Sequence, residues 1–300
     1  MKPGRFVAGI GLGAAGLMAL RRWRPWLEQE RGPWPPDGVQ PGTALVTGAS
    51  SGLGAAYARH LAARGFDLIL VARRQSRLDE LAQAMRERYA VRAEALVADL
   101  ADPADLGRAV ARVEEERDLT MLVNNAGFGL PSSFARSDIE RQLDMIRVHD
   151  EASVRLARAG LPAMLARNRG AIVNVSSLAG FIPLPGNVNY SASKAYLIEF
   201  SRALQAELRG TGVRVQALCP GFMNTEFHDE MGRDRWNLAQ LPAFLWMSPD
   251  EVTADSLACL EAGEVVCVPG AVYRVVAAVA RNPLTSWMVE DAAAAVMRRR

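Results

Sequence analysis

The chain has 300 residues, of which 50% are hydrophobic, and it carries a formal net charge of +2. This length allows one large α/β domain or two small ones, and so small a charge gives no reason to expect nucleic acid as a partner. The three histidines and three cysteines (Cys219, Cys259 and Cys267) show no metal-ligand or paired spacing, so we predict no metal site and expect each cysteine to be a buried, reduced thiol.

The N-terminal segment, residues 1–31, contains an apolar run at 6–20 between two basic flanks. The run has fifteen residues, short of the ~20 that a spanning helix needs. The arginines directly after it disfavour a cleaved signal peptide. Two interpretations stay open: a membrane anchor, tilted or interfacial, and a helix packed on the domain or on a partner. An anchor would keep the body of the protein cytoplasmic, because the heavier positive flank follows the run.

A strand, a glycine-rich turn and a helix open the folded domain. Residues 32–42 hold four prolines and predict an extended linker, so this domain is expected to begin near residue 43. An apolar strand at 43–46 leads into the turn, and a helix follows at 55–64. This order is typical of a site for a dinucleotide pyrophosphate, because glycines allow close backbone approach and the helix N-terminus supplies N–H donors. The predicted cofactor contacts in this turn are Gly48, Ser50, Ser51, Gly52, Leu53 and Gly54.

The end of the second predicted strand, at 67–71, indicates which dinucleotide binds. An NAD site would need Asp or Glu there for the ribose 2′-hydroxyl, but the chain has Ala72 followed by Arg73 and Arg74. Guanidinium groups suit a 2′-phosphate through charge-assisted hydrogen bonds. We therefore favour NADP over NAD, with Arg73 as a phosphate contact. The alternative is two surface arginines that only follow a strand.

Strands and helices alternate along the rest of the domain. Further strands are predicted at 93–98, 119–123, 171–175, 213–218 and 265–268, and helices at 76–89, 103–117, 138–167 and 189–208. The alternation predicts an α/β fold, a Rossmann-type doubly wound parallel sheet in a single domain over residues 43–270. A C-terminal helical extension is expected at 271–300, with helices at 271–280 and 287–300. The three arginines at its end suit a helix C-terminus or an anionic membrane surface.

Tyr190 and Lys194 lie four residues apart on the helix predicted at 189–208, so they share one face of it. Because a nearby cation favours the charged form of a phenol, we expect Lys194 to lower the pKa of Tyr190 from its usual value of about 10. Such a phenol can give or take a proton at a carbonyl or alcohol oxygen. Ser177 stands just beyond the strand at 171–175, at the edge where open α/β sheets keep their sites. Taken alone, the pair is equally compatible with a half-buried tyrosine beside a solvated lysine.

These motifs together resemble the short-chain dehydrogenase/reductase family over residues 43–270. Thr47-Gly48-x-x-x-Gly52-x-Gly54 resembles its cofactor motif, Asn124-Asn125-Ala126-Gly127 its sheet-stabilising motif, and Ser177, Tyr190 and Lys194 its catalytic set. The resemblance implies an NADP-dependent carbonyl reductase or alcohol dehydrogenase. In it Tyr190 donates a proton to the carbonyl oxygen, Ser177 hydrogen-bonds that oxygen, and Tyr190 and Lys194 bind the nicotinamide ribose. Further cofactor contacts implied by the family pattern are Asp99, Leu100, Asn125, Ala126, Gly127, Pro220, Gly221 and Thr225.

One position departs from the family pattern. Many members carry an Asn in the long central helix, where it helps to hold a proton-relaying water, and His149 stands at the corresponding position here. Histidine can donate, accept and change charge near neutral pH, so it would either serve the relay or damage it. We expect His149→Asn to keep or raise turnover. A second hypothesis is that His149 identifies a cofactor-binding scaffold or sensor with little turnover. The presence of Ser177, Tyr190 and Lys194 argues against this hypothesis.

Residues 222–248 stand where the family has its substrate lid, and they are rich in large apolar side chains. These are Phe222, Met223, Phe227, Met231, Trp236, Leu238, Leu241, Phe244, Leu245 and Trp246. They predict a small hydrophobic substrate, a ketone or secondary alcohol on a lipid, steroid or acyl chain, or they merely pack the lid onto the body of the domain. The resemblance also implies a homo-oligomer, a dimer or tetramer formed through the long central helices.

Overall fold

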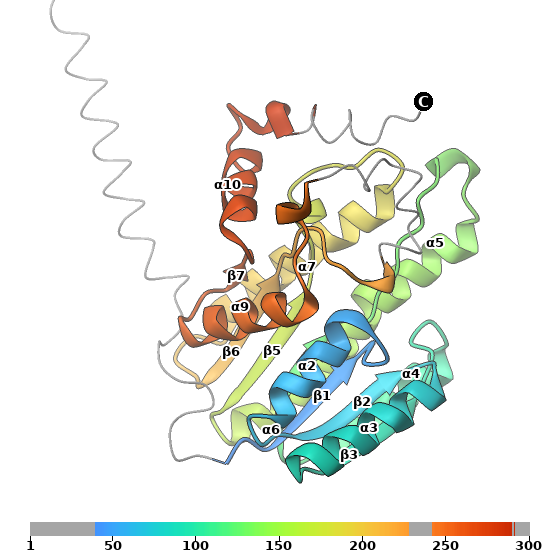
Figure 1. The fold of residues 1–300 in the computed structure, drawn as a ribbon, viewed down its shortest axis with the longest axis vertical. Coiled ribbons are helices and arrows are strands. Elements are labelled where there is room, and N and C mark those ends of the chain that lie inside the picture. Colours follow the sequence, from blue (N-terminus) through green and yellow to red (C-terminus); the bar gives the residue numbers. More distant parts are fainter. Residues whose placement is uncertain (1–39, 228–241, 290, 292–300) are drawn as a thin grey trace, which may run out of the picture.

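The computed structural model describes residues 40–227, 242–289 and 291. Within these ranges seven strands form one parallel sheet in the order β3-β2-β1-β4-β5-β6-β7, with helices on both of its faces (Figure 1). The strands are β1 (Thr43–Thr47), β2 (Asp67–Ala72), β3 (Ala93–Val97), β4 (Leu119–Asn124), β5 (Gly170–Val175), β6 (Val213–Leu218) and β7 (Val266–Cys267). The doubly wound parallel sheet predicted from the sequence is confirmed.

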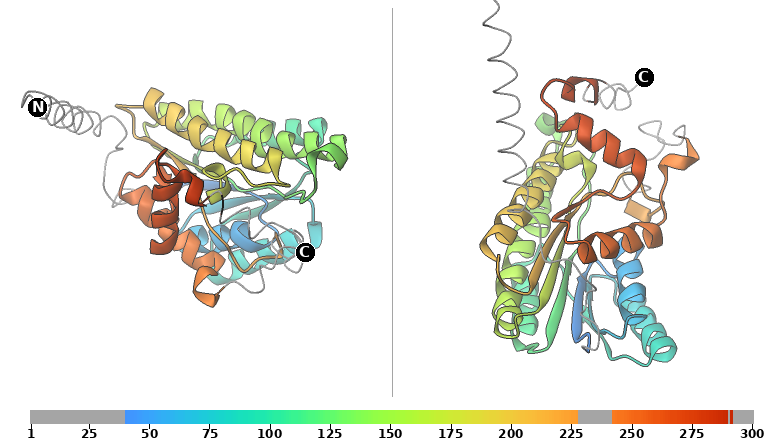
Figure 2. Two further views of the ribbon diagram at one scale, coloured as in Figure 1. Left: turned by 90° about the horizontal axis from the view of Figure 1, so that it is seen from above. Right: turned by 90° about the vertical axis from the view of Figure 1, so that its left-hand side faces the viewer.

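The helices form two layers, which Figure 2 shows from above. Their bounds are α2 (Gly52–Ala62), α3 (Gln75–Tyr89), α4 (Pro103–Glu115), α5 (Ile139–Ile146), α6 (Ala152–Ala166), α7 (Val188–Glu207), α9 (Pro249–Glu261) and α10 (Ala271–Ala280). Helices α2, α3 and α9 cover one face of the sheet, and α4, α6 and α7 cover the other. Short 3-10 turns lie at Phe134–Arg136, Leu178–Gly180 and Ala243–Leu245.

The central strands are mostly apolar because both faces of the sheet are buried. Side chains alternate along a strand, so Val46 and Leu70 enter the core beneath α2, α3 and α9, whereas Leu45 and Ile69 enter the core beneath α4, α6 and α7. The pairs Leu45–Ile69 and Val46–Leu70 lie side by side in the β1–β2 register. Polar residues that line the cavity described below follow β4 and β5 directly, at the carboxyl edge of the sheet.

The long central helix is not continuous α-helix as we expected for 138–167. A π-helical turn at Arg147–Glu151, which contains His149, joins α5 to α6. Turns of this kind insert one extra residue and often occur at functional sites. The last strand, predicted at 265–268, is limited to two residues.

Parts of the two terminal predictions lie outside the described residues. These are the apolar run at 6–20 and most of the helix predicted at 287–300. The helix predicted at 271–280 is present as α10. Among the helices that the structure describes, none combines the length and the apolar character needed to cross a membrane.

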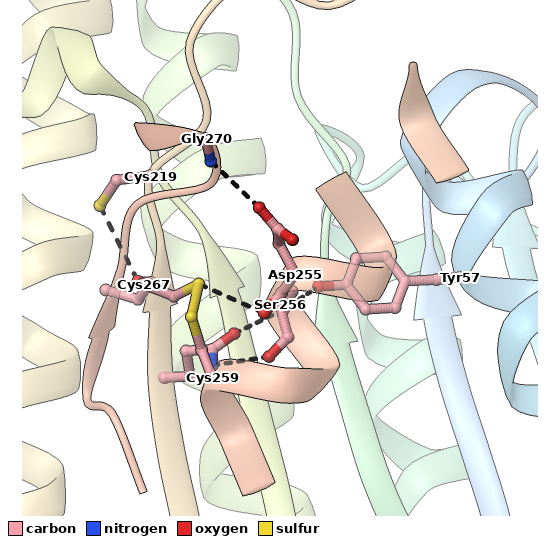
Figure 3. Close-up of a disulfide and its surroundings, with 9 residues drawn as sticks. Tyr57, Cys219, Asp255, Ser256, Cys259, Cys267 and Gly270 are labelled. Carbon is pink, nitrogen blue, oxygen red and sulfur yellow. Dashed lines mark hydrogen bonds between the residues drawn. A yellow bond between two sulfur atoms is a disulfide. The ribbon is translucent and has the colours of Figure 1, made fainter. Parts of the chain in front are cut away.

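Two of the three cysteines form a disulfide, so the expectation of three reduced thiols is wrong. Cys259 on α9 is bonded to Cys267 on β7 (Figure 3), while Cys219 is free and buried. Helix α9 ends beside the strand that follows it, which brings the two Cα atoms to 5.9 Å although only eight positions separate the residues. The spacing of the cysteines along the chain does not by itself predict that this pair lies close together.

Candidate functional site

The turn after β1 ties together the ends of β1 and β4. The backbone N–H groups of Asn125 and Ala126 both donate to Thr47 Oγ1 at 2.9 Å, and Asn125 Nδ2 donates to Thr47 O at 2.8 Å. The chain turns at Gly48, where φ is +66°. A Cβ atom on Gly54 would overlap the carbonyl oxygen of Gly48. Glycine at both positions therefore lets the N-terminus of α2 lie directly against the turn, the arrangement that binds a pyrophosphate.

A cavity of about 150 Å³ opens beside this turn at the carboxyl edge of the sheet. The sheet order reverses direction between β1 and β4, and ligands of open α/β sheets bind at such a switch point. The residues lining it are Gly48, Ser51, Gly52, Leu53, Asn125, Ala126, Gly127, Val175, Ser176, Ser177, Tyr190, Lys194, Pro220, Gly221, Met223, Thr225 and Phe227. The structure thus brings most of the predicted site residues together. Those it leaves outside the lining are Ser50, Gly54, Arg73, Asp99 and Leu100.

Ser177, Tyr190 and Lys194 reach the cavity from two elements. Ser177 follows β5, and its Oγ accepts a hydrogen bond from Ala179 N at 3.1 Å at the start of a 3-10 turn. Tyr190 and Lys194 lie one turn apart on α7 and are only 8% and 5% exposed. Lys194 Nζ donates to Val175 O at 2.9 Å and lies 5.6 Å from the centre of the Tyr190 ring. The three functional groups therefore line one cavity.

The pKa of Tyr190 is shifted in the direction opposite to our expectation. Burial raises it to about 12, and a hydrogen bond with the Ser177 side chain offsets only part of that effect. Lys194 was expected to dominate, but it is itself buried, and its own pKa falls to about 8 because burial disfavours the ammonium ion. Desolvation of the phenolate outweighs the attraction of the cation, so Tyr190 keeps its proton at neutral pH.

A carboxylate that the sequence did not single out lies near Lys194. Burial raises the pKa of Asp150, in the π-helical turn, to about 6, while the charge of Lys194 acts to lower it. Asp150 in return raises the pKa of Lys194. Asp150 Oδ1 is buried and has no hydrogen-bond partner among the described residues. Each group thus favours the charged form of the other, and the Asp150 carboxylate partly compensates the buried ammonium of Lys194.

His149 links the cofactor side of the cavity to the helix that carries Tyr190. Its Nε2 accepts a hydrogen bond from Phe128 N at 3.1 Å, so Nδ1 carries the proton and faces Ser193 Oγ at 2.9 Å. Ser193 Oγ donates in turn to Tyr190 O at 3.1 Å. Burial is the main reason that the pKa of His149 lies well below its ordinary value. The ring is therefore neutral: Nε2 holds the backbone N–H of Phe128, and Nδ1 holds the side chain of Ser193.

Arg74, rather than Arg73, faces the glycine-rich turn. The Arg73 side chain is 70% exposed and lies 3.7 Å from the Asp99 carboxylate. Arg74 donates to Ser50 Oγ at 2.9 and 3.0 Å and to Ser51 Oγ at 2.7 Å. The sequence predicts a guanidinium just after β2, but β2 ends at Ala72 and Arg74 is already the N-cap residue of α3. The sequence alone therefore does not decide whether Arg73 or Arg74 reaches the glycine-rich turn.

Apolar side chains surround Tyr190 at the cavity. Tyr190 packs with Met145 and Ala179, and the ring of Phe227 lies 5.9 Å from the ring of Tyr190, centre to centre. Phe128, Leu130 and Leu184 border the same cluster.

Other lid residues serve packing. Phe222, Leu245 and Met247 pack against Tyr273 of α10, and Phe222 N donates to the Tyr273 hydroxyl at 3.1 Å. Residues 228–241 of the lid, with Met231, Trp236, Leu238 and Leu241, lie outside the described part of the chain. In the part that is described, no group of His, Cys, Asp or Glu is placed to hold a metal ion.

Comparison with known proteins agrees with this geometry. The family model described as short chain dehydrogenase matches residues 42–236. The very-long-chain 3-oxoacyl-CoA reductase of Anas platyrhynchos is 37% identical over 224 residues, which cover 71% of this chain and 69% of that protein. The inactive hydroxysteroid dehydrogenase-like protein 1 of Homo sapiens is 36% identical over 184 residues. That match covers 61% of this chain and 56% of the human protein, so the chain spans little more than half the length of this relative.

A solved structure gives the same result for the fold. The short-chain dehydrogenase from Sphingobium yanoikuyae in complex with NADPH is 37% identical to this chain, with a TM-score of 0.72. The match covers 84% of this chain and 93% of the Sphingobium chain. Because the family model spans well over half of the sequence, and the sheet order and the solved structure agree with it, this chain belongs to the short-chain dehydrogenase/reductase family of oxidoreductases.

Proposed function

We propose that this protein is an NADP-dependent oxidoreductase that transfers hydride between the nicotinamide and a hydrophobic ketone or secondary alcohol. One observation carries the proposal: Ser177, Tyr190 and Lys194 line the same cavity as the glycine-rich turn, at the switch point of the sheet. A fold alone does not define an activity. The roles proposed below therefore rest on the groups that meet in this cavity.

The residues around the turn fit a phosphorylated dinucleotide. A Cβ atom on Gly48 would lie within 3 Å of Asn125 Nδ2 and Ala126 Cα, so only glycine lets the turn pack this closely against the end of β4. At the end of β2, Arg74 and the hydroxyls of Ser50 and Ser51 form a cluster of donors suited to a 2′-phosphate. The proposed phosphate contact is thus Arg74 in place of Arg73. The other proposed cofactor contacts are Gly48, Gly52, Leu53, Gly54, Asp99, Leu100, Asn125, Ala126, Gly127, Tyr190, Lys194, Pro220, Gly221 and Thr225.

Tyr190 is the proposed proton donor. Since its pKa is raised to about 12, the phenol is protonated at neutral pH and can protonate a carbonyl oxygen. The Ser177 hydroxyl hydrogen-bonds the same oxygen as negative charge develops on it, and Lys194 places a positive charge near the phenolate that is left. The nicotinamide supplies the hydride, and the protein supplies orientation.

The proposed substrate is a carbonyl on a long apolar body, such as an acyl chain, a lipid or a steroid. Phe227 and Met223 line the cavity, and Phe128, Leu184 and Phe227 pack around Tyr190. The name of the Anas platyrhynchos relative, a very-long-chain 3-oxoacyl-CoA reductase, is consistent with such a substrate. Burial of apolar substrate surface against such side chains contributes about 25 cal/mol of binding free energy per Å². Longer chains should therefore bind more tightly.

We also propose contact with the cytoplasmic face of a membrane. The apolar run at 6–20 is one support. The other is the segment from α10 onward, where Val275, Leu284, Trp287 and Met288 are 51–83% exposed. Arg274 and Arg281 lie in the same segment, and exposed apolar and basic side chains together suit a lipid surface. Deleting residues 1–31 should lower the bound fraction in membrane fractionation, and an unchanged fraction would contradict the anchor.

A homo-oligomer is proposed on independent grounds. Ile139, Leu143 and Ile146 on α5 and Leu165 on α6 are 37–56% exposed. A second copy of the chain could cover these side chains, as the family pattern implies for the long central helices. Sedimentation of the purified protein as a monomer at all concentrations would argue against this.

The competing function is a cofactor-binding scaffold or sensor with little turnover. The human relative named as inactive keeps this alternative relevant. Oxidation of NADPH, followed with a panel of hydrophobic ketones and with NADH as the comparison, separates the two. Turnover that increases with the apolar size of the ketone supports the proposal. Tight NADPH binding without turnover of any carbonyl would replace it with the scaffold.

A further inference from the structure

Arg74 holds a fixed position over the glycine-rich turn. It is the N-cap residue of α3 and comes two positions after the end of β2. Three hydrogen bonds to Ser50 and Ser51 hold its Nε and Nη2 groups against the turn. Its remaining group, Nη1, points to a different segment of the chain, where it donates to Glu226 Oε2 at 2.9 Å. The guanidinium thus bridges the cofactor turn and the lid.

Glu226 accepts hydrogen bonds from two arginines at once. Besides Arg74, Arg77 Nη1 donates to its two carboxylate oxygens at 2.7 and 2.9 Å. These bonds are the main reason that the pKa of Glu226 is lowered, so the carboxylate stays ionised at neutral pH. Glu226 directly follows Thr225, whose methyl group lies 3.2 Å from where a Cβ atom on Gly52 would stand. The carboxylate is therefore held at the turn by charge and by its position in the chain.

The place that this carboxylate occupies is the one that a 2′-phosphate needs. Residues just after β2 read the 2′ position of the adenosine ribose in dinucleotide folds, and arginine there accommodates a phosphate. Carboxylates and phosphates satisfy guanidinium groups in the same forked manner. We propose, on the basis of the NADP-dependent function proposed above, that Glu226 is an internal competitor of the 2′-phosphate. Arg74 and Arg77 hold either the carboxylate of Glu226 or the phosphate of NADP, and binding of NADP releases the start of the lid from the glycine-rich turn.

The competition has a limited size, because the side chains of Glu226, Arg74 and Arg77 are 46%, 40% and 44% exposed. Partly exposed ion pairs are screened by water and contribute little each. Two such pairs correspond to an affinity change of about three- to tenfold. Glu226 therefore tunes affinity and selectivity for NADP without preventing its binding.

The test compares two probes that differ only in the 2′-phosphate, adenosine 2′,5′-bisphosphate and adenosine 5′-monophosphate. Calorimetry on the full-length protein measures both dissociation constants. We expect Glu226→Gln to bind the bisphosphate about three- to tenfold more tightly than the wild type, with the monophosphate unchanged. Glu199→Gln is the matched control, because Glu199 also pairs with an arginine, Arg202 on α7, at 2.6 Å. It should change neither constant. Unchanged or weaker binding of the bisphosphate by Glu226→Gln would overturn the proposal.

A second background separates competition from simple repulsion between like charges. In a chain carrying Arg74→Gln and Arg77→Gln, the carboxylate has lost both partners, so Glu226→Gln should give no further gain for the bisphosphate. A gain of undiminished size there would show repulsion alone and would contradict competition. Melting temperatures of all variants confirm that they are folded.

The same dissociation constants also test whether the wild type prefers NADP, independently of the competition by Glu226. If the wild type binds both probes equally but Glu226→Gln prefers the bisphosphate, the competition is supported and the assignment of NADP to the wild type is wrong. If neither protein distinguishes the probes, both ideas are overturned.

Discussion

Replacing Lys194 with methionine is expected to stabilise the protein while abolishing its activity. The ammonium group is buried, and lowering its pKa from 10.5 to about 8 corresponds to about 3 kcal/mol of destabilisation. Methionine replaces the four-carbon stem of lysine, lacks the terminal nitrogen and has no charge to desolvate. Part of the gain is lost, because Val175 O loses its donor and an unsatisfied buried group costs about 1–3 kcal/mol. Asp150 also loses its compensating charge. We therefore expect a net gain of about 1 kcal/mol at pH 7 without cofactor.

The sign of the pH dependence gives the sharper test. The native state of the wild type releases the Lys194 proton at a lower pH than the unfolded state does. Burial of the Lys194 ammonium therefore lowers the free energy of unfolding by its full amount below pH 8. This destabilisation disappears as the pH rises toward 10.5. Urea unfolding of both proteins at several pH values should show an advantage of Lys194→Met at pH 7 that shrinks above pH 8. A variant that is less stable than the wild type at pH 7 by several kcal/mol, or a difference independent of pH, would refute the reasoning.

Two further predictions concern His149 and the disulfide. His149→Asn should keep turnover within a few-fold of the wild type. It should lower the free energy of unfolding by about 1–3 kcal/mol, because the shorter side chain leaves buried hydrogen-bond partners unpaired. Loss of turnover in a folded variant would give the ring a direct catalytic role. Thiol titration of the unfolded, unreduced protein should find one reactive group, Cys219, and reduction of Cys259–Cys267 should lower stability by about 2–3 kcal/mol. Three reactive thiols before reduction would show that the bond does not form in solution.

The fold could be predicted because its signals are local. An apolar strand, a glycine turn and a helix lie within twenty residues of one another, and the same alternation recurs along the domain. The cavity could also be anticipated, since the carboxyl ends of parallel strands meet at one edge. Ser177, Tyr190 and Lys194 were therefore correctly expected to lie close together.

The remaining features depend on contacts between distant segments or on burial. The pKa of Tyr190 is decided by how completely the chain excludes water from the phenol, which the spacing of Tyr190 and Lys194 does not reveal. The hydrogen bond from Arg74 to Glu226 joins positions 152 residues apart. The disulfide can be predicted only once the position of α9 relative to β7 is known. Such properties of the site follow from the packed structure.

The central claim is that Tyr190 protonates the substrate oxygen, and Tyr190→Phe tests it most directly. Phenylalanine fills the same space without the hydroxyl, so NADPH affinity should stay within about two- to threefold of the wild type. A general acid contributes about 10²–10⁴-fold to the rate, and we expect reduction of a hydrophobic ketone to slow by at least about 10²-fold. A Tyr190→Phe variant that reduces the ketone at the wild-type rate would contradict the account.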